Sequence, residues 1–103
     1  MSVENSKIID YITNSNDTVV LTISDHLEWN DGYEHVFLLQ EKINAYIMAI
    51  ESKQLSSYFK SSNDKVTISV ALKYAPNDIG IRFFKEVQKV LLNAGYKFDY
   101  YIL

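Results

Sequence analysis

Four residues have side chains whose types and spacing could do chemistry together: Asp25, His26, Glu34 and His35. Imidazole and carboxylate groups are ligands for zinc, manganese and iron, and an open position on such a metal activates water. His26 follows a strand-like run and His35 falls in the first turns of a helix, so the eight residues between them could bring the two rings together. The cluster therefore predicts a ligand, metal or acid/base site.

A structural interpretation of the same four residues is favoured by helix geometry. Neighbours such as Glu34 and His35 project about 100° apart on a helix and seldom bind one ion. Asp25 can bond to loop amides at the end of a strand, and Glu34 at a helix start interacts well with the helix dipole. The spacing also differs from HExxH, in which two histidines lie one turn apart. The enzyme interpretation is the alternative.

The composition excludes several classes of site. The 103 residues contain no cysteine, which excludes disulfides, thiolate catalysis and cysteine-bound zinc. The net charge is -3 and the lysines are scattered, so we expect no nucleic-acid partner. The three glycines, at positions 32, 80 and 95, form no phosphate loop, and no cofactor is predicted. With no signal peptide or membrane span in the pattern, we expect a cytoplasmic protein without a membrane partner.

Hydrophobic periodicity divides the chain into six elements of one domain, residues 1–103. Alternating or β-branched runs predict strands, and three- and four-residue spacing predicts helices. The expected elements are strands 7–13 and 18–24, a helix at 31–53 started by Asn30 or Asp31, strand 65–73, a helix at 78–94 ended by Gly95, and strand 97–103. This order predicts an α+β fold: a four-stranded mixed sheet (β-β-α-β-α-β) with two helices packed on one face.

The first predicted helix is apolar on two sides. Its core stripe consists of Val36, Leu39, Ile43, Tyr46, Ile47 and Ile50. The opposite side carries Phe37, Leu38, Ala45 and Met48. Exposed apolar patches are uncommon on monomers, so this second stripe predicts self-association or a protein partner. Equally, the last strand or the loop at 54–64, anchored by Leu55, Tyr58 and Phe59, could cover it.

Two further groups of aromatic and apolar residues are read as packing. Trp29, the single tryptophan, is expected to cover the core, with its indole N–H bonded to a backbone carbonyl; stacking on a ligand is the alternative. The second helix should bury Ile79, Phe83, Val87, Val90 and Ala94, flanked by Phe84 and Leu91.

Two segments resemble an uncharacterised family of small bacterial proteins: VVLTISDHLEW at Val19–Trp29 and EHVFLLQEKINAYIMAIES at Glu34–Ser52. The shared pattern is a strand ending in Asp-His-x-x-Trp, then a helix with Glu-His and Leu-Gln-x-Lys-x-Asn-x-Tyr. The resemblance implies a bacterial origin and a compact fold. It brings no activity, substrate, cofactor or catalytic residue with it.

The function predicted from these observations is non-catalytic. We expect a bacterial accessory, regulatory or immunity-type protein that binds a protein partner or forms a homodimer through its first helix or a sheet face. The alternative is a small metal-dependent or acid/base enzyme that uses Asp25, His26, Glu34 and His35.

Overall fold

The computed structural model describes residues 10–15, 17–53, 55, 59 and 65–103. Its element order confirms the expected α+β fold. The elements are β1 (Tyr11–Ser15), β2 (Thr18–Asp25), α1 (Glu34–Glu51), β3 (Lys65–Leu72), α2 (Asp78–Asn93) and β4 (Lys97–Ile102). Within the described residues, no helix is long and apolar enough to cross a membrane.

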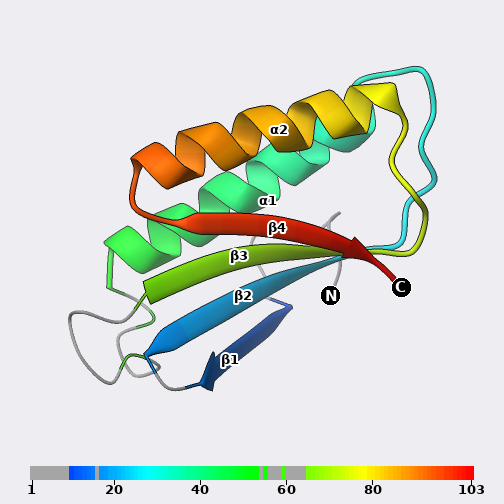
Figure 1. The fold of residues 1–103 in the computed structure, drawn as a ribbon. Helices are drawn as coiled ribbons and strands as arrows, with labels where there is room; N and C mark the ends of the chain where they lie inside the picture. Colours follow the sequence, from blue (N-terminus) through cyan, green and yellow to red (C-terminus); the bar gives the residue numbers. More distant parts are fainter. Residues whose placement is uncertain (1–9, 16, 54, 56–58, 60–64) are drawn as a thin grey trace.

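The four strands form one mixed sheet in the order β1-β2-β3-β4. β1 pairs antiparallel with β2, whereas β2–β3 and β3–β4 are parallel pairs. Parallel neighbours need a crossover connection, and α1 and α2 supply the two crossovers. Both helices lie on the same face of the sheet and run in the same direction (Figure 1). The carboxyl ends of β2, β3 and β4 therefore share one edge, near which both helices begin.

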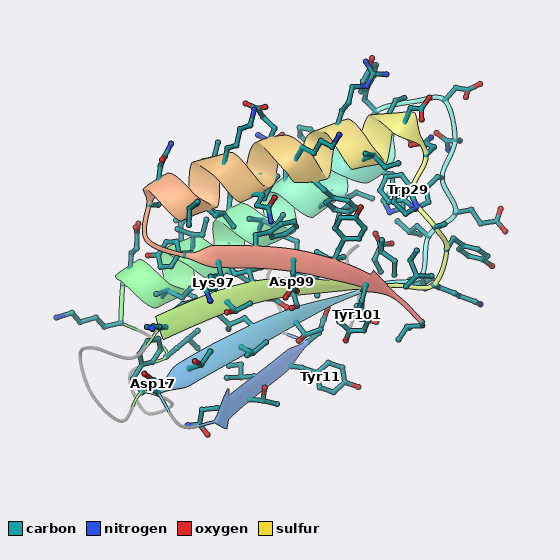
Figure 2. All side chains as sticks on the ribbon, viewed as in Figure 1. Tyr11, Asp17, Trp29, Lys97, Asp99 and Tyr101 are labelled. Carbon is teal, nitrogen blue, oxygen red and sulfur yellow. The ribbon has the colours of Figure 1, made fainter. Side chains whose placement is uncertain are left out.

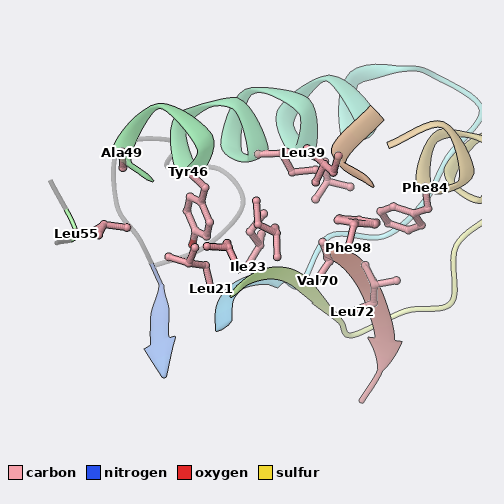
Figure 3. Packing of buried hydrophobic residues seen from close by; sticks show 14 residues of the cluster. Leu21, Ile23, Leu39, Tyr46, Ala49, Leu55, Val70, Leu72, Phe84 and Phe98 are labelled. Atoms are coloured by element: carbon pink, nitrogen blue, oxygen red, sulfur yellow. The ribbon is translucent and has the colours of Figure 1, made fainter. Parts of the chain in front are cut away.

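The core lies between the sheet and the helices (Figure 3). Because strand side chains alternate, β2 directs Val19, Leu21 and Ile23 to the helical side, and each of these is fully buried. β3 contributes its even-numbered residues in the same way: Val66, Ile68, Val70 and Leu72. Leu39 and Tyr46 of α1 reach down onto these strands, as predicted from the helical stripe.

The start of α1 differs from the prediction. The helix begins at Glu34, three residues later than expected, and its N-cap residue Tyr33 makes no side-chain cap hydrogen bond. Asn30 does not cap the helix, because its side chain accepts a hydrogen bond from the Gly32 amide, 2.9 Å away, in a local turn. The Asn30 carbonyl accepts a second bond from the Asn77 side chain, which ties this turn to the start of α2.

The limits of α2 agree with the prediction, but its buried face does not. Asn77 caps the helix by accepting a hydrogen bond from the Gly80 amide, and Gly95 follows it with a φ of +91°, which favours glycine. Val90, expected in the core, is 59% exposed, whereas the predicted flanking residues Phe84 and Leu91 are each 2% exposed. α2 is rotated so that these two face the sheet, because β4 supplies Phe98 beneath them.

The hairpin and the long connection differ in detail. β1 continues to Ser15, which pairs with Thr18, so the turn is shorter than the predicted Asn14–Asp17 segment; residues 7–9 lie outside the described residues. Leu55 is buried and Phe59 packs against the core, which confirms these two anchors. Tyr58, the third expected anchor, lies outside the described residues.

Candidate functional site

The structure brings two of the four predicted site residues into direct contact. Asp25 ends β2 and His35 lies in the first turn of α1, with His35 Nε2 2.6 Å from Asp25 Oδ2. Their side chains are 0% and 4% exposed, respectively. The other carboxylate oxygen of Asp25 accepts a hydrogen bond from the Leu27 amide, and its backbone carbonyl accepts one from the Lys73 amide. Asp25 thus joins β2, the following loop and the end of β3 to α1.

Trp29 covers this pair. Its ring stacks on the His35 imidazole with centroids 3.7 Å apart, and its indole N–H donates to the Tyr74 carbonyl, which confirms the expected cover and backbone bond. Trp29 lies at the carboxyl edge of the sheet, beside the start of α2 (Figure 2). A Cβ added to Gly80 would lie 2.6 Å from the Trp29 ring, so only glycine allows α2 this close.

The chemistry open to the pair is limited by its burial. A carboxylate accepts hydrogen bonds, so the proton between the two side chains belongs to His35 Nε2. The second ring nitrogen, Nδ1, would have to exchange a proton with a substrate, but it is buried and has no hydrogen-bond partner among the described residues. With His35 stacked beneath Trp29, the pair holds β2 against α1 and presents no atom to a substrate.

The other two members of the predicted cluster are exposed: His26 in the loop after β2 and Glu34 at the first position of α1. Across residues 10–15, 17–53, 55, 59 and 65–103, no group of three histidine, aspartate or glutamate side chains could hold a metal ion. Asp25 accepts a hydrogen bond from a loop amide at the end of its strand, as the structural interpretation of the sequence expected, and its other carboxylate oxygen contacts His35.

A second buried ionic pair was missed by sequence reasoning. Lys42 of α1 lies 3.3 Å from Asp10, just before β1, and both side chains are 0% exposed. Asp10 also accepts a hydrogen bond from the Ser24 amide. The Tyr46 hydroxyl accepts a hydrogen bond from the Asp10 amide and donates to the Thr22 carbonyl. The sequence contained one indication of this pair. Lys42 lies four residues before Tyr46 and next to Ile43, which places it on the side of α1 that faces the sheet.

Burial changes the acid–base behaviour of Tyr46. Desolvation by burial, with a smaller contribution from the nearby Asp10 carboxylate, raises the pKa of the Tyr46 hydroxyl well above its ordinary value. Its backbone bonds keep the neutral hydroxyl as both donor and acceptor. This group fixes the N-terminal strand to α1 and has no exposed surface for a ligand.

The four predicted interface residues of α1 differ in how far their side chains are exposed. Phe37 is 57% exposed and Met48 is 70% exposed, so neither is covered by β4 or by the described part of the long connection. Leu38 and Ala45 are partly buried, and Leu38 packs against the core. The exposed apolar surface of the helix is therefore narrower than predicted and consists mainly of Phe37 and Met48, with Tyr33 just before the helix at 71%.

An apolar groove runs along the junction of α1 and α2. One section, about 320 Å³ in volume, has Ile43 and Ile47 of α1 on one side and Val87 and Val90 of α2 on the other. A second section continues it toward the helix starts, and the two sections share Phe83 and Glu86. We name this groove, together with the exposed residues Phe37 and Met48, the helical face.

Comparison with known proteins adds a family but no activity. Searches of curated proteins and of solved structures found no match to the chain. The model of a family of unknown function, DUF6572, matches residues 1–103. The chain therefore belongs to this family of unknown function.

Proposed function

We propose that the protein acts by binding another protein chain through its helical face. The observation that carries this proposal is the combination of a lined groove with large apolar side chains beside it that face solvent. Buried cores of protein interfaces are rich in aromatic residues and methionine, the types present at Phe37 and Met48. A partner that covers these side chains would remove exposed apolar area from water.

The charges beside the groove indicate what the partner must carry. Of its charged groups, α1 exposes only carboxylates, whereas α2 exposes Arg82, Lys85 and Lys89 beside Asp78 and Glu86, so its exposed charge is net positive. A complementary partner therefore presents basic groups to α1 and acidic groups to α2, around an apolar centre. These features favour a protein partner over a nucleic acid, because the carboxylates of α1 would repel phosphates.

The enzyme alternative has less support. Its strongest feature is the 2.6 Å contact of Asp25 with His35, since a carboxylate that orients an imidazole recurs in acid/base sites. Against it, neither side chain is accessible to a substrate and Nδ1 lies in the interior. An enzyme would first have to expose this buried pair. Binding through the helical face needs no such rearrangement, because Phe37 and Met48 are already exposed.

Affinity capture from the native host lysate tests the proposal. We expect wild-type protein to retain a partner in stoichiometric amount and Phe37→Asp to lose it, because an aspartate cannot be buried unpaired in an apolar contact. Tyr11→Asp is the matched control, since Tyr11 is 59% exposed, close to the 57% of Phe37, but lies on β1. Loss with Tyr11→Asp and retention with Phe37→Asp would move the binding surface to the sheet. Absence of any stoichiometric partner, together with a purified chain that stays monomeric, would contradict the proposal.

A further inference from the structure

The exposed charges of α1 are all negative. Glu34, Glu41 and Glu51 are exposed, and Lys42, the single lysine within Glu34–Glu51, is buried in its pair with Asp10. Phe37 and Met48 occupy the same side of the helix as Glu41, because residues four, seven and eleven apart project in similar directions. The outward side of α1 is thus acidic with two large apolar side chains.

The outward side of α2 is basic. Arg82, Lys85 and Lys89 are exposed and, at spacings of three and four residues, share one side of the helix. The two acidic residues of α2, Asp78 and Glu86, are exposed as well, so the three cations leave the helix with a net positive exposed charge of one; Arg82 and Glu86 both line the groove. Val90 and Leu92, at 59% and 65% exposed, add apolar surface near the end of the helix.

The two helices are suited to face each other across a two-fold axis. They run in the same direction over the sheet (Figure 1). The residues that line the groove show which part of α1 lies beside which part of α2 along the helix axes. The α1 side of the groove lies opposite residues between Phe83 and Leu91 of α2 and consists of Gln40, Ile43, Asn44 and Ile47. Glu41 is therefore at the level of Lys85 and Lys89. A two-fold axis parallel to the helices preserves this level and exchanges α1 with α2.

We propose that the partner of the helical face is a second copy of this chain, with α1 of each copy packed against α2 of the other. This inference rests on the proposed function, because it names the occupant of the same surface. In the dimer, Glu41 of each copy faces Lys85 and Lys89 of the other copy, so this contact occurs twice. Phe37 and Met48 of α1 pack against the apolar side chains of the opposing α2 and its groove, including Val90.

The size of the helical face fits such a dimer. At 1.5 Å per residue, the 18 residues of α1 and 16 of α2 extend about 27 and 24 Å. Two helix diameters give a width of about 20 Å, and therefore a flat projection of roughly 500 Å². Side-chain relief raises this toward the roughly 800 Å² per partner of a standard interface. We expect a reversible dimer whose dissociation constant is in the micromolar range and increases with salt.

Sedimentation velocity on the purified chain, over a concentration series, tests this arrangement with charge reversals. Glu41→Lys places lysine opposite lysine at both symmetric contacts, and Lys85→Glu with Lys89→Glu places glutamate opposite glutamate. Each variant should dimerise at least about tenfold more weakly than wild type, because like charges replace opposite ones. Mixed together, the two variants should form a heterodimer of wild-type affinity, since every contact then joins opposite charges. Unchanged thermal melts would show that both variants remain folded.

The outcomes separate this inference from the function beneath it. A wild-type chain that stays monomeric at several hundred micromolar would overturn the dimer, and a captured partner lost with Phe37→Asp would then still support binding by the helical face. A dimer indifferent to both charge variants would place the contact elsewhere, for example at the free edge of β4, and would overturn the arrangement. Variants that dissociate but fail to pair with each other would also overturn it.

Discussion

Each side of α1 carries two residues that a simple amphipathic helix would place on the other side. The side facing the sheet buries His35 and Lys42, whereas the side facing solvent exposes Phe37 and Met48. The difference lies in the available partners. Asp25 contacts His35 and Asp10 contacts Lys42, so each buried polar side chain of α1 has a carboxylate partner inside the protein. On the outward side, the described residues leave Phe37 and Met48 exposed, and in our proposal a second molecule covers them.

The largest effect on stability should come from breaking the inner side at Lys42. Lys42→Met leaves the Asp10 carboxylate buried without its cation, and loss of one partner of a buried pair costs about 3–5 kcal/mol. Urea unfolding followed by circular dichroism measures the change. Adding Asp10→Asn should recover part of it, because the uncompensated charge is then gone. A loss below about 1 kcal/mol for Lys42→Met would show that the pair is not a main contact of the inner side.

Gly80→Ala should have the next largest effect on stability, because it displaces Trp29, the side chain that covers His35. The new methyl group would lie 2.6 Å from the Trp29 ring and must displace it, at a cost of about 1–3 kcal/mol. In a Trp29→Ala background the same change should cost much less, because the close contact that remains is with Pro76 Cβ at 3.0 Å and alanine is favoured over glycine in helices by about 1 kcal/mol. Unfolding free energies of the four proteins give this cycle. Additive effects would contradict a direct contact.

Tyr46 should make the inner side sensitive to alkaline pH. Its pKa in the folded chain is raised by burial, so above the ordinary tyrosine pKa, about 10, the unfolded chain releases a proton that the folded chain keeps. The contribution of Tyr46 is complete below this pH and falls by about 1.4 kcal/mol per pH unit above it. Tyr46→Phe should be less stable at neutral pH but lose stability less steeply above pH 10. Identical slopes would contradict this role. The Asp10 amide donates to this hydroxyl and Lys42 Nζ lies 5.6 Å from the centre of the Tyr46 ring, so comparison with the variant, rather than wild type alone, isolates Tyr46.

The smallest stability effect should come from the outward side. Met48→Asp changes a side chain that is 70% exposed, so the free energy of unfolding should stay within about 0.5 kcal/mol of wild type. The same variant should weaken binding by the helical face. A large loss of stability would instead place Met48 in the core and remove the contrast between the two sides.

The sequence predicts what local chemistry decides. The limits of α2 follow from Asn77 and Gly95, and alternation in β3 indicates which residues face the helices, although Ser69 and Ala71 on the other face are buried too. The pairing of Lys42 with Asp10 joins residues 32 positions apart, and no periodicity encodes it. The exposure of Val90 likewise depends on how far α2 turns to place Phe84 and Leu91 over β4, which its own pattern does not contain.

The candidate site was predicted in part for the same reason. Asp25 and His35 lie 10 positions apart, across one short loop, and the sequence grouped them correctly. His26 and Glu34 joined the group through proximity in sequence alone, but both side chains are exposed in the structure. On the outward side of α1, Phe37 and Met48 are exposed as predicted, whereas Leu38 and Ala45 are partly covered because they lie nearer the sheet side of the helix.

The contacts of Trp29 give the molecule a built-in optical probe. It is the chain's single tryptophan, and its ring touches His35 at the start of α1 while its edge meets Phe84 and Gly80 of α2. Its emission therefore originates at the one place where both helices and the carboxyl edge of the sheet converge. Separation of either helix from that edge would expose the indole to water and shift its fluorescence to longer wavelength. Local opening at this corner can thus be distinguished from global unfolding without any label.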